Sequence, residues 1–350
     1  MPADRLLPLM DSLTPPSAAI AATAAERLAG LATPPGALGR LGELGVWLCA
    51  AQGACPPEPL DDVRLVVFAG DHGVAQHGVS AYPPAVTAAM VSTIVAGRAG
   101  VSALAQAHGV HVRVLDVSVD GDVPGLPPEV SAHKLRRSSG ALHLTDALSP
   151  TDTAAAFELG RRVAREEISA GAQLLMSGDL GIGNTTPAAC LVAAALGLGA
   201  DEVVGRGTGI DDATWAHKRD VVAAALVRAG DRVDDPLETL TAMGSADLAA
   251  TVGFLVAAAE SGVPVLLDGL MSVACALTAD RVAPGAAAWF VAGHRSTEPA
   301  QAHALKALGL EPLLDLGMRL GEGSGAVAAV PMLRSAVAVM RDVALLSEIL

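Results

Sequence analysis

Residues 63–73 read VRLVVFAGDHG: an apolar run rich in valine ends in glycine, followed by an acidic residue and a histidine. Continuous apolar runs of this kind are typical of strands that are buried on both faces, as in a parallel sheet. Four similar runs follow, at residues 111–119, 173–177, 263–267 and 287–292. Helix-length stretches lie between them, at residues 151–171, 185–197, 213–230 and 237–262. This alternation predicts a doubly wound, mostly parallel α/β sheet of the Rossmann-like type, with right-handed crossovers.

The two ends of the chain have a different pattern. Residues 1–60 and 310–350 have helical patterns without strand-like runs, and the last stretch is amphipathic. We therefore expect a small helical domain built from both termini (1–60 plus 310–350) beside a large α/β domain (61–309). Within the large domain, Asp152 and Gly171 are the expected caps of the first long helix.

Composition limits the classes of function. The chain has 350 residues, 51% of them hydrophobic and 17% charged, which predicts a folded protein with a sizeable core. A net charge of −14 argues against nucleic-acid or anionic-membrane binding, because no basic excess neutralises phosphates. No apolar run reaches the length of about 18 residues that a membrane span needs, and the N-terminus lacks a signal-peptide pattern. Four cysteines without a CxxC pair predict a reduced, cytoplasmic protein.

Glycine-rich polar segments follow the predicted strands, where open α/β sheets bind their ligands. Four of them come directly after strands: AGDHG (69–73), SGDLGIGNTTP (177–187), LDGLMS (267–272) and AGHRSTEP (292–299). Two more are GRGTGIDD (205–212) and RLGEGSGA (319–326). Their concentration predicts one ligand site at the carboxyl edge of the sheet.

Two of these segments suit a phosphate group. Gly181 and Gly183 precede a predicted helix, so free backbone amides there can bind an anion, unless the segment is an ordinary capped turn. Residues 205–212 offer a second cradle with Lys218 nearby, or else a flexible loop whose aspartates cap the next helix. Thr186 stands where a dinucleotide GxGxxG fingerprint needs its third glycine, and no Walker A motif is present. The acidic pair, Asp211 and Asp212, follows the glycines of the 205–212 segment instead of preceding them, which disfavours a metal-bound diphosphate donor.

Ionisable residues in the same segments are candidates for catalysis. Glu322 lies between two glycines in an apolar stretch, so we expect a raised pKa suited to a general base. The alternative is an acid that merely begins the last helix. Asp71, His72 and His77 could bind zinc, but further ligands and an HExxH motif are missing. We therefore expect this loop to position the substrate instead. We therefore predict no metal and no cofactor.

Seven motifs, in order, resemble those of the nicotinate-nucleotide–dimethylbenzimidazole phosphoribosyltransferases of cobalamin nucleotide-loop assembly. They are PPGALGRLGELGVWL (34–48), FAGDHGVAQHGVSAYP (68–83), SGDLGIGNTTP, GRGTGIDD, DGLMSVACALTAD (268–280), GHRSTEP (293–299) and RLGEGSGA. The resemblance implies transfer of the phosphoribosyl group from nicotinate mononucleotide to 5,6-dimethylbenzimidazole, giving α-ribazole 5′-phosphate and nicotinate. It also implies a homodimer and a parallel-sheet domain with a small helical one.

The resemblance assigns roles to individual positions. Glu322 corresponds to the catalytic base, and Asp179 to a second acidic residue that is often Glu in the family. The positions implied to bind substrate fall into two groups. Gly181, Gly207, Gly209, Lys218 and Ser296 correspond to the phosphoribosyl site, and Ser80 and Leu320 to the surroundings of the base. Ala300 and Gln301 depart from the Gly-His expected there. A nucleotide-dependent oxidoreductase and a non-catalytic nucleotide-binding protein are the alternatives, and the missing GxGxxG disfavours the first.

Overall fold

Five parallel strands form one sheet in the order β2-β1-β3-β4-β5, in a computed structural model that describes residues 9–123 and 125–350. The strands are β1 (Val63–Gly70), β2 (Val110–Ser118), β3 (Leu174–Leu180), β4 (Val265–Leu267) and β5 (Phe290–Ala292). Each coincides within a few residues with a predicted strand. The predicted α/β class with a doubly wound parallel sheet is therefore confirmed.

The central strand shows why its sequence is apolar throughout. From Val63 to Ala69, β1 pairs with β2 on one side and β3 on the other. Alternate residues point to opposite faces of a strand, and each face of this sheet is covered. Leu65 and Val67 belong to the hydrophobic cluster of one face, and Val66 and Phe68 to that of the other. Both sets must be apolar, so the sequence does not alternate.

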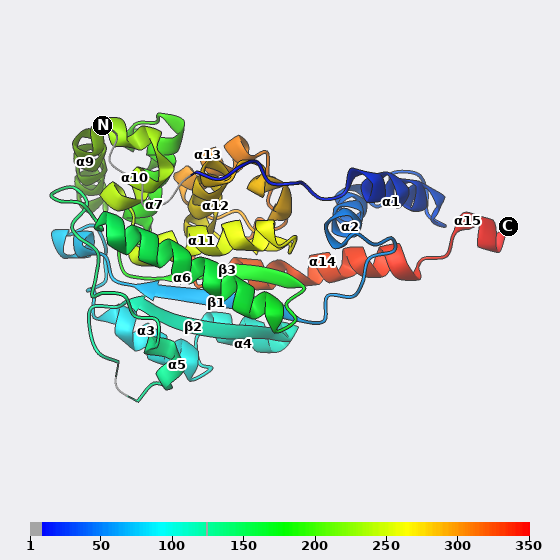
Figure 1. Ribbon diagram of the computed structural model, residues 1–350, viewed down its shortest axis with the longest axis horizontal. Coiled ribbons are helices and arrows are strands. Elements are labelled where there is room, and N and C mark those ends of the chain that lie inside the picture. The colour runs from blue at the N-terminus through cyan, green and yellow to red at the C-terminus, as the bar shows by residue number, and fades with distance from the viewer. Residues whose placement is uncertain (1–8, 124) are drawn as a thin grey trace.

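Helices cover both faces (Figure 1). One face carries α2 (Gly39–Gln52), α3 (Val86–Val95), α4 (Gly100–His108) and α14 (Ser324–Asp342). The other carries α6 (Pro150–Ser169), α7 (Thr185–Leu196), α9 (Asp212–Ala229), α10 (Pro236–Met243), α11 (Ala246–Glu260), α12 (Leu270–Val282) and α13 (Pro299–Leu308). Helices α6 and α11 pack closely, because side chains at Gly160 and Gly253 would collide with the backbone of the opposite helix.

Two local predictions need correction. Residues 237–262 were expected to form a single helix, but they form two. The first helix ends before Gly244, and the Ser245 hydroxyl caps α11 by accepting a hydrogen bond of 3.4 Å from Leu248 N. The expected cap Asp152 is also wrong. Ser149 is the N-cap of α6, and Asp152 completes a capping box at the third helical position, with hydrogen bonds of 3.1 and 3.5 Å.

Helices from both ends of the chain lie together (Figure 1). Helix α2 packs against α1 (Ala18–Gly30) and α14, around a small cluster made of Ala24, Leu31, Cys49 and Met340. Helix α14 also contributes Val327 and Leu333 to the main core beneath the sheet. The division into 1–60 plus 310–350 and 61–309 stays a prediction, and residues 1–8 of its first range lie outside the described part of the chain.

One stretch, Val86–His108, is long and apolar enough to cross a membrane by length and composition alone. The structure divides it into α3 and α4, separated by residues 96–99. As one such stretch in a chain with a layered α/β core, it is a weak indication of a span.

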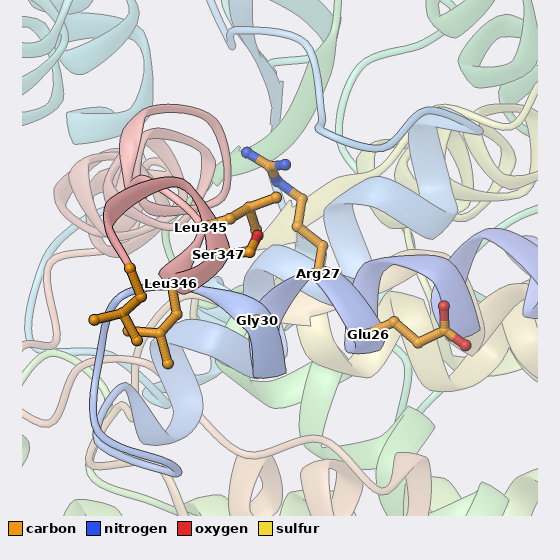
Figure 2. A pocket seen from close by; sticks show the side chains of 7 residues that line it. Glu26, Arg27, Gly30, Leu345, Leu346 and Ser347 are labelled. Carbon is orange, nitrogen blue, oxygen red and sulfur yellow. The ribbon is translucent and has the colours of Figure 1, made fainter.

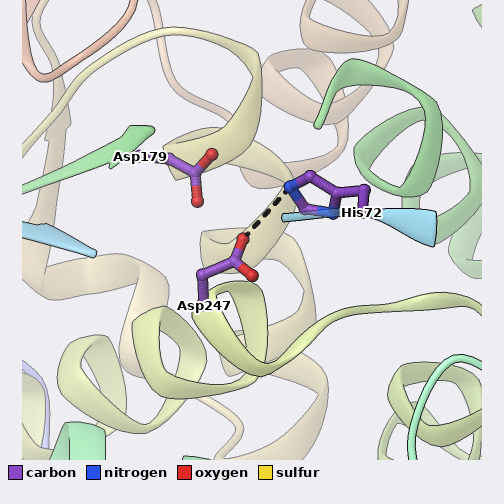
Figure 3. A group of neighbouring side chains, drawn as sticks. All are labelled: His72, Asp179 and Asp247. Atoms are coloured by element: carbon purple, nitrogen blue, oxygen red, sulfur yellow. Dashed lines mark ion pairs between the residues drawn. The ribbon is translucent and has the colours of Figure 1, made fainter. Parts of the chain in front are cut away.

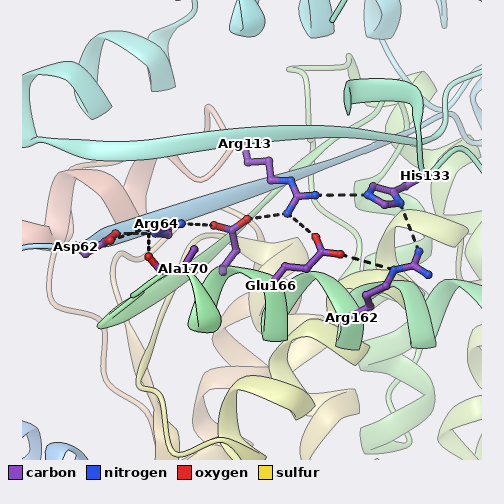
Figure 4. A network of polar contacts seen from close by, with 8 residues as sticks. Asp62, Arg64, Arg113, His133, Arg162, Glu166 and Ala170 are labelled. Atoms are coloured by element: carbon purple, nitrogen blue, oxygen red, sulfur yellow. Dashed lines mark hydrogen bonds and ion pairs between the residues drawn. The ribbon is translucent and has the colours of Figure 1, made fainter. Parts of the chain in front are cut away.

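A network of ion pairs joins α6 to the amino-terminal part of the sheet (Figure 4). Arg64 at the start of β1 pairs with Asp62 at 2.7 Å and with Glu167 at 3.1 Å. Arg113 in β2 pairs with Glu167 at 2.8 Å and with Glu166 at 2.9 Å. Each of these charges has a partner of opposite sign, so this end of the sheet is electrostatically satisfied.

Candidate active site

The carboxyl ends of the strands bring five ionisable side chains to one edge of the sheet. His72 follows β1, Asp179 lies within the end of β3, Asp268 follows β4 and His294 follows β5. Glu322 lies just before α14. All five are buried, with exposed fractions of 5% or less. The predicted location of the site, at this edge, therefore agrees with where the structure gathers these groups.

Glu322 is held in an unusual backbone conformation. Its φ of +63° lies in the left-handed region, which a residue other than glycine rarely adopts, and which marks functional sites when the surroundings enforce it. Its Oε2 is buried without a hydrogen-bond partner. Burial raises the pKa of Glu322, the nearby charge of Asp268 adds to this, and the Val101 amide partly opposes it. The raised pKa makes this carboxylate a stronger base than an ordinary glutamate side chain.

Asp268 fixes the loop that carries Glu322. Its carboxylate accepts hydrogen bonds from the amides of Gly323 at 3.1 Å, Gly325 at 2.8 Å and Ala326 at 3.1 Å. His294 Nε2 lies 3.4 Å from Asp268 Oδ1. Burial alone would raise the pKa of Asp268, but His294 and the backbone donors outweigh it and lower the pKa. Asp268 therefore fixes the backbone that follows Glu322, at the N-terminus of α14.

Asp179 has one satisfied oxygen and one free oxygen. Its Oδ1 accepts a hydrogen bond of 2.7 Å from Asn184 Nδ2, and Oδ2 is buried without a partner. Burial raises the pKa of Asp179 well above its ordinary value, and the nearby Asp247 raises it further. His72, Asp179 and Asp247 point toward one another (Figure 3). Sequence reasoning missed Asp247, because it lies at the start of a helix with no strand-end motif.

Lys218 connects the two predicted phosphate loops. It is 1% exposed, and its Nζ donates to Thr185 Oγ1 at 2.7 Å and to the Gly205 carbonyl at 3.4 Å. Burial lowers the pKa of Lys218, while the charge of Glu298 opposes the shift. The Gly207 amide donates to Glu298 Oε1 at 2.8 Å. The segments at 181–187, 205–212 and 293–299 therefore meet around one buried ammonium group.

The glycines of this site are required for different structural reasons. Gly207 and Gly209 have φ values of +48° and +92°, and a side chain on Gly209 would approach Arg319 Nη1 at 3.2 Å. A side chain on Gly181 would instead collide with the Gly70 carbonyl and lie 2.6 Å from His72 Nε2. Gly181 is thus required for close packing of β3 against the end of β1.

The departure from the family pattern at Gln301 has a structural explanation. The Gln301 side chain is fully buried, and its Oε1 accepts from the Ser296 amide at 2.6 Å and from the Ser296 hydroxyl at 2.9 Å. Its Nε2 donates to the His294 carbonyl at 2.9 Å and to the Asp268 carbonyl at 3.4 Å. Gln301 therefore ties together the segments that follow β4 and β5.

The two positions predicted around the base lie at the rim of the site. Ser80 Oγ is 3.3 Å from Thr208 Oγ1, so it rests against the 205–212 loop. Leu320 is 54% exposed and approaches Gly100 in α4. Neither residue contacts the Glu322 carboxyl group through a hydrogen bond.

Two surface hollows lie elsewhere. One, of about 530 Å³, lies between α1 and the last residues of the chain, including α15 (Leu346–Ile349) (Figure 2). The other, of about 500 Å³, lies between α2, β5 and the end of α13. None of the nine predicted site residues lines either hollow.

Comparison with known proteins finds similar chains over nearly the whole length of this one. A family model described as "Phosphoribosyltransferase" matches residues 13–349. A relative from Mycolicibacterium paratuberculosis named nicotinate-nucleotide–dimethylbenzimidazole phosphoribosyltransferase is 52% identical over 337 residues, 96% of each chain. A relative of the same name from Mycobacterium tuberculosis is 52% identical over 95% of this chain and 92% of its own length.

A solved structure is similar throughout. The crystal structure of CobT from Thermus thermophilus superposes with a TM-score of 0.90 at 44% identity, covering 95% of this chain and 98% of the other. A family match over nearly the whole chain, relatives of one name and a shared fold all point to the same family. The chain therefore belongs to the nicotinate-nucleotide–dimethylbenzimidazole phosphoribosyltransferase family.

Proposed function

We propose that this enzyme transfers the phosphoribosyl group of nicotinate mononucleotide to 5,6-dimethylbenzimidazole in cobalamin lower-ligand biosynthesis. The bond from the ribose anomeric carbon to the nicotinate nitrogen breaks, and a bond to a benzimidazole nitrogen forms. The products are nicotinate, α-ribazole 5′-phosphate and one proton. The observation that carries the proposal is Glu322, a buried carboxyl group with a free oxygen, held by a loop that Asp268 anchors.

Glu322 is the proposed base. The attacking benzimidazole becomes cationic unless its other N–H loses a proton, so a base is required as the new bond forms. A carboxylate whose pKa is raised by burial accepts that proton more readily than an ordinary glutamate does. The left-handed backbone of Glu322 and the contacts of Asp268 with the loop amides fix the direction of the Glu322 side chain. The carboxyl group therefore keeps its orientation during the reaction.

Asp179 is the proposed second acidic group. The breaking glycosidic bond leaves positive charge on the sugar, which a nearby carboxylate stabilises. The free Oδ2 of Asp179 supports this role, and its bond to Asn184 fixes the other oxygen. Ser80 and Leu320 are the proposed rim of the base pocket.

The phosphate is proposed to bind to the 205–212 loop with Lys218 and Ser296, together with Gly181. The support is a buried ammonium group between two glycine-rich loops, in one of which Gly207 and Gly209 adopt left-handed backbone conformations without a Cβ atom. This arrangement needs no metal ion on the phosphate. The KM for nicotinate mononucleotide should be unchanged by EDTA or by added magnesium, and a rise on chelation that magnesium reverses would contradict it.

A homodimer in the cytoplasm is the proposed state of the enzyme. Only 28% of an 18-residue window within Val86–His108 is buried, and the side chains of Leu316, Leu320 and Tyr82 are more than half exposed. An exposed apolar surface of this kind often marks an interface between subunits. Light scattering at micromolar concentration should give twice the chain mass of 35.0 kDa. A monomer mass would overturn the dimer.

Product analysis tests the reaction itself. The purified chain is incubated with nicotinate mononucleotide and a panel of bases (dimethylbenzimidazole, benzimidazole, adenine and a phenol), and products are separated by chromatography and identified by mass. Nicotinate and the α-riboside phosphate should appear in equal amounts. Release of nicotinate without a base-linked product would indicate a hydrolase instead, and oxidation or reduction of an added nicotinamide dinucleotide would indicate an oxidoreductase.

A further inference from the structure

We propose that Arg319 binds the 5′-phosphate of nicotinate mononucleotide at the 205–212 loop. The inference rests on the proposed function, and it adds to that function a cation that offsets the charge of the substrate. Arg319 begins the RLGEGSGA segment that carries Glu322, but the sequence motifs assign no role to it. The assignment comes from the place to which the folded chain brings its guanidinium group.

The guanidinium group of Arg319 lies against the glycine turn of the loop. Its Nη1 donates a hydrogen bond of 3.3 Å to the Gly207 carbonyl. A Cβ atom added to Gly209 would lie 3.2 Å from Nη1, 3.7 Å from Nη2 and 3.9 Å from Cζ of the same side chain. Glycine at position 209 therefore lets the planar group approach the backbone of the loop closely.

Most hydrogen-bond donors of Arg319 remain available. A guanidinium group carries five N–H donors and binds a phosphate group through two parallel hydrogen bonds. In the part of the chain that the structure describes, this group makes only the hydrogen bond to the Gly207 carbonyl, and no carboxylate pairs with it. Arg319 is exposed, so a ligand that reaches the loop can contact the remaining donors.

The other cations of this loop region already have partners. Arg206 forms an ion pair with Asp212. Lys218 is 1% exposed, and the carboxylate of Glu298 lies close enough to offset part of its charge. Among the described residues of this region, Arg319 is therefore the cation whose charge remains available to a ligand.

Several amides of the loop are also occupied. The Gly207 amide donates to Glu298 Oε1 at 2.8 Å, and the amides of Gly209 and Ile210 donate to the Arg206 carbonyl at 2.9 and 3.2 Å. A phosphate monoester carries about 1.5 to 2 negative charges at pH 7. The amides that remain offer only partial charges, so a cationic side chain beside the loop is needed to balance the ligand.

The substrate carries a second anion, the carboxylate of its pyridine ring. The phosphate is favoured because Arg319 contacts the loop to which the phosphate is proposed to bind, and because a dianion attracts a guanidinium group more strongly than a monoanion does. Two related ligands separate the anions. Nicotinate riboside lacks the phosphate, and nicotinamide mononucleotide lacks the carboxylate.

Binding of these ligands to the full chain tests the inference without any need for turnover. Calorimetry gives the Kd of nicotinate mononucleotide, nicotinamide mononucleotide and nicotinate riboside, each without an acceptor base. Arg319→Gln should weaken the binding of both mononucleotides about 10- to 100-fold and leave that of the riboside unchanged. Arg319→Lys keeps the charge but loses the paired donors, so its effect should be smaller.

Arg165→Gln is the matched control for the loss of one positive charge. Arg165 lies on α6, its side chain is 52% exposed, and its Nη2 is 3.8 Å from Glu260 Oε2. This variant should bind all three ligands as the unchanged chain does, since the site is distant and solvent screens the charge. Thermal unfolding of each variant shows whether it is folded at the temperature of the titration.

Three results would overturn the inference. Arg319→Gln could bind nicotinate mononucleotide as the unchanged chain does, or it could weaken the riboside equally, which would indicate a structural role. A loss confined to the two ligands with a carboxylate would assign Arg319 to the pyridine ring instead. An unchanged chain that binds neither mononucleotide would overturn the proposed function as well, so the two failures are distinguished by the unchanged chain alone.

Discussion

The two ends of the sheet differ in whether their buried polar side chains have partners. At the amino ends, Arg64 and Arg113 each pair with two carboxylates, and Glu167 accepts from both (Figure 4). At the carboxyl ends, Asp179, Glu298 and Glu322 each have a buried oxygen without a partner. Most of the unpartnered buried side-chain atoms in the described part of the chain lie at this second edge.

This contrast separates stability from function. A buried polar atom without a partner costs stability, and it persists where a ligand supplies the missing contact. Groups at the amino ends should therefore matter for folding, and those at the carboxyl ends for turnover. Active sites commonly show this exchange of stability for activity. Substitutions at the two ends are matched tests of the difference.

The largest effect is expected for Glu322→Gln. The amide keeps the size of the side chain but cannot take the benzimidazole proton, so turnover should fall about 10²- to 10⁴-fold. Substrate binding should change little. Steady-state kinetics and thermal unfolding measure the two properties on one sample. Near-normal turnover would show that Glu322 is not the base, and Asp179 would become the next residue to test.

The pH dependence of turnover should follow the same group. Burial and the charge of Asp268 raise the pKa of Glu322, so the rising limb of the pH–rate profile should have its midpoint above the ordinary glutamate value. Below that midpoint the rate should fall tenfold per pH unit, because the base is protonated. A profile that stays flat through the ordinary range of glutamate would contradict the assignment.

The stability of the enzyme should show the matching sign. Because the pKa of Glu322 is raised in the folded chain, its proton contributes stability below the unfolded-state pKa, and this is lost as pH rises through the folded-state pKa. Glu322→Gln should therefore gain stability relative to the unchanged chain as pH rises through that interval. Denaturant titrations at several pH values measure the difference.

Gly209→Val should raise the KM for nicotinate mononucleotide about 10- to 100-fold. The left-handed φ of +92° and the approach to Arg319 make a branched side chain cost about 1–3 kcal/mol within the loop. The KM for the base should change far less. Gly197→Val is a matched control, because Gly197 has a φ of +65° with open space around it. Equal shifts for both substrates would mean that the loop is only a linker.

Glu167→Gln tests the opposite end of the sheet. It replaces one of the two acceptor oxygens that serve Arg64 and Arg113 with an amide donor, in a side chain that is only 10% exposed, so the free energy of unfolding should fall by about 1–3 kcal/mol. Turnover at a temperature where the variant is folded should be unchanged. A loss of turnover without a loss of stability would break the contrast between the two ends.

The smallest effect is expected at the surface. Arg137 and Asp122 form an exposed ion pair, with side chains 54% and 84% exposed. Pairs of this kind contribute about 0–1 kcal/mol, since solvent screens them. Arg137→Ala should leave both unfolding and turnover nearly unchanged. A large loss of stability or of turnover would show that this surface ion pair contributes to folding or to catalysis.

The amino-acid sequence by itself determined the sheet and the edge of the sheet at which the candidate site lies. Continuous apolar runs such as residues 63–69 suit only strands covered on both faces, and strand-end glycines with acids mark the carboxyl edge. Glu322 could be singled out because two glycines isolate it in apolar sequence. The end of α6 near Gly171 was also readable. Its start was predicted at Asp152 but lies at Ser149, because serine and aspartate both cap helices.

Only the tertiary structure decided which distant groups meet. Asp247 joins His72 and Asp179 because α11 crosses back under the ends of β1 and β3, and no local pattern specifies that crossing. Asp268 reaches the amides of residues 323–326, and Gln301 the carbonyls of two strand ends, for the same reason. Local sequence fixes hydrogen-bond and burial preferences along one segment. Contacts between segments depend on how the crossovers pack, so they arise only in the folded chain.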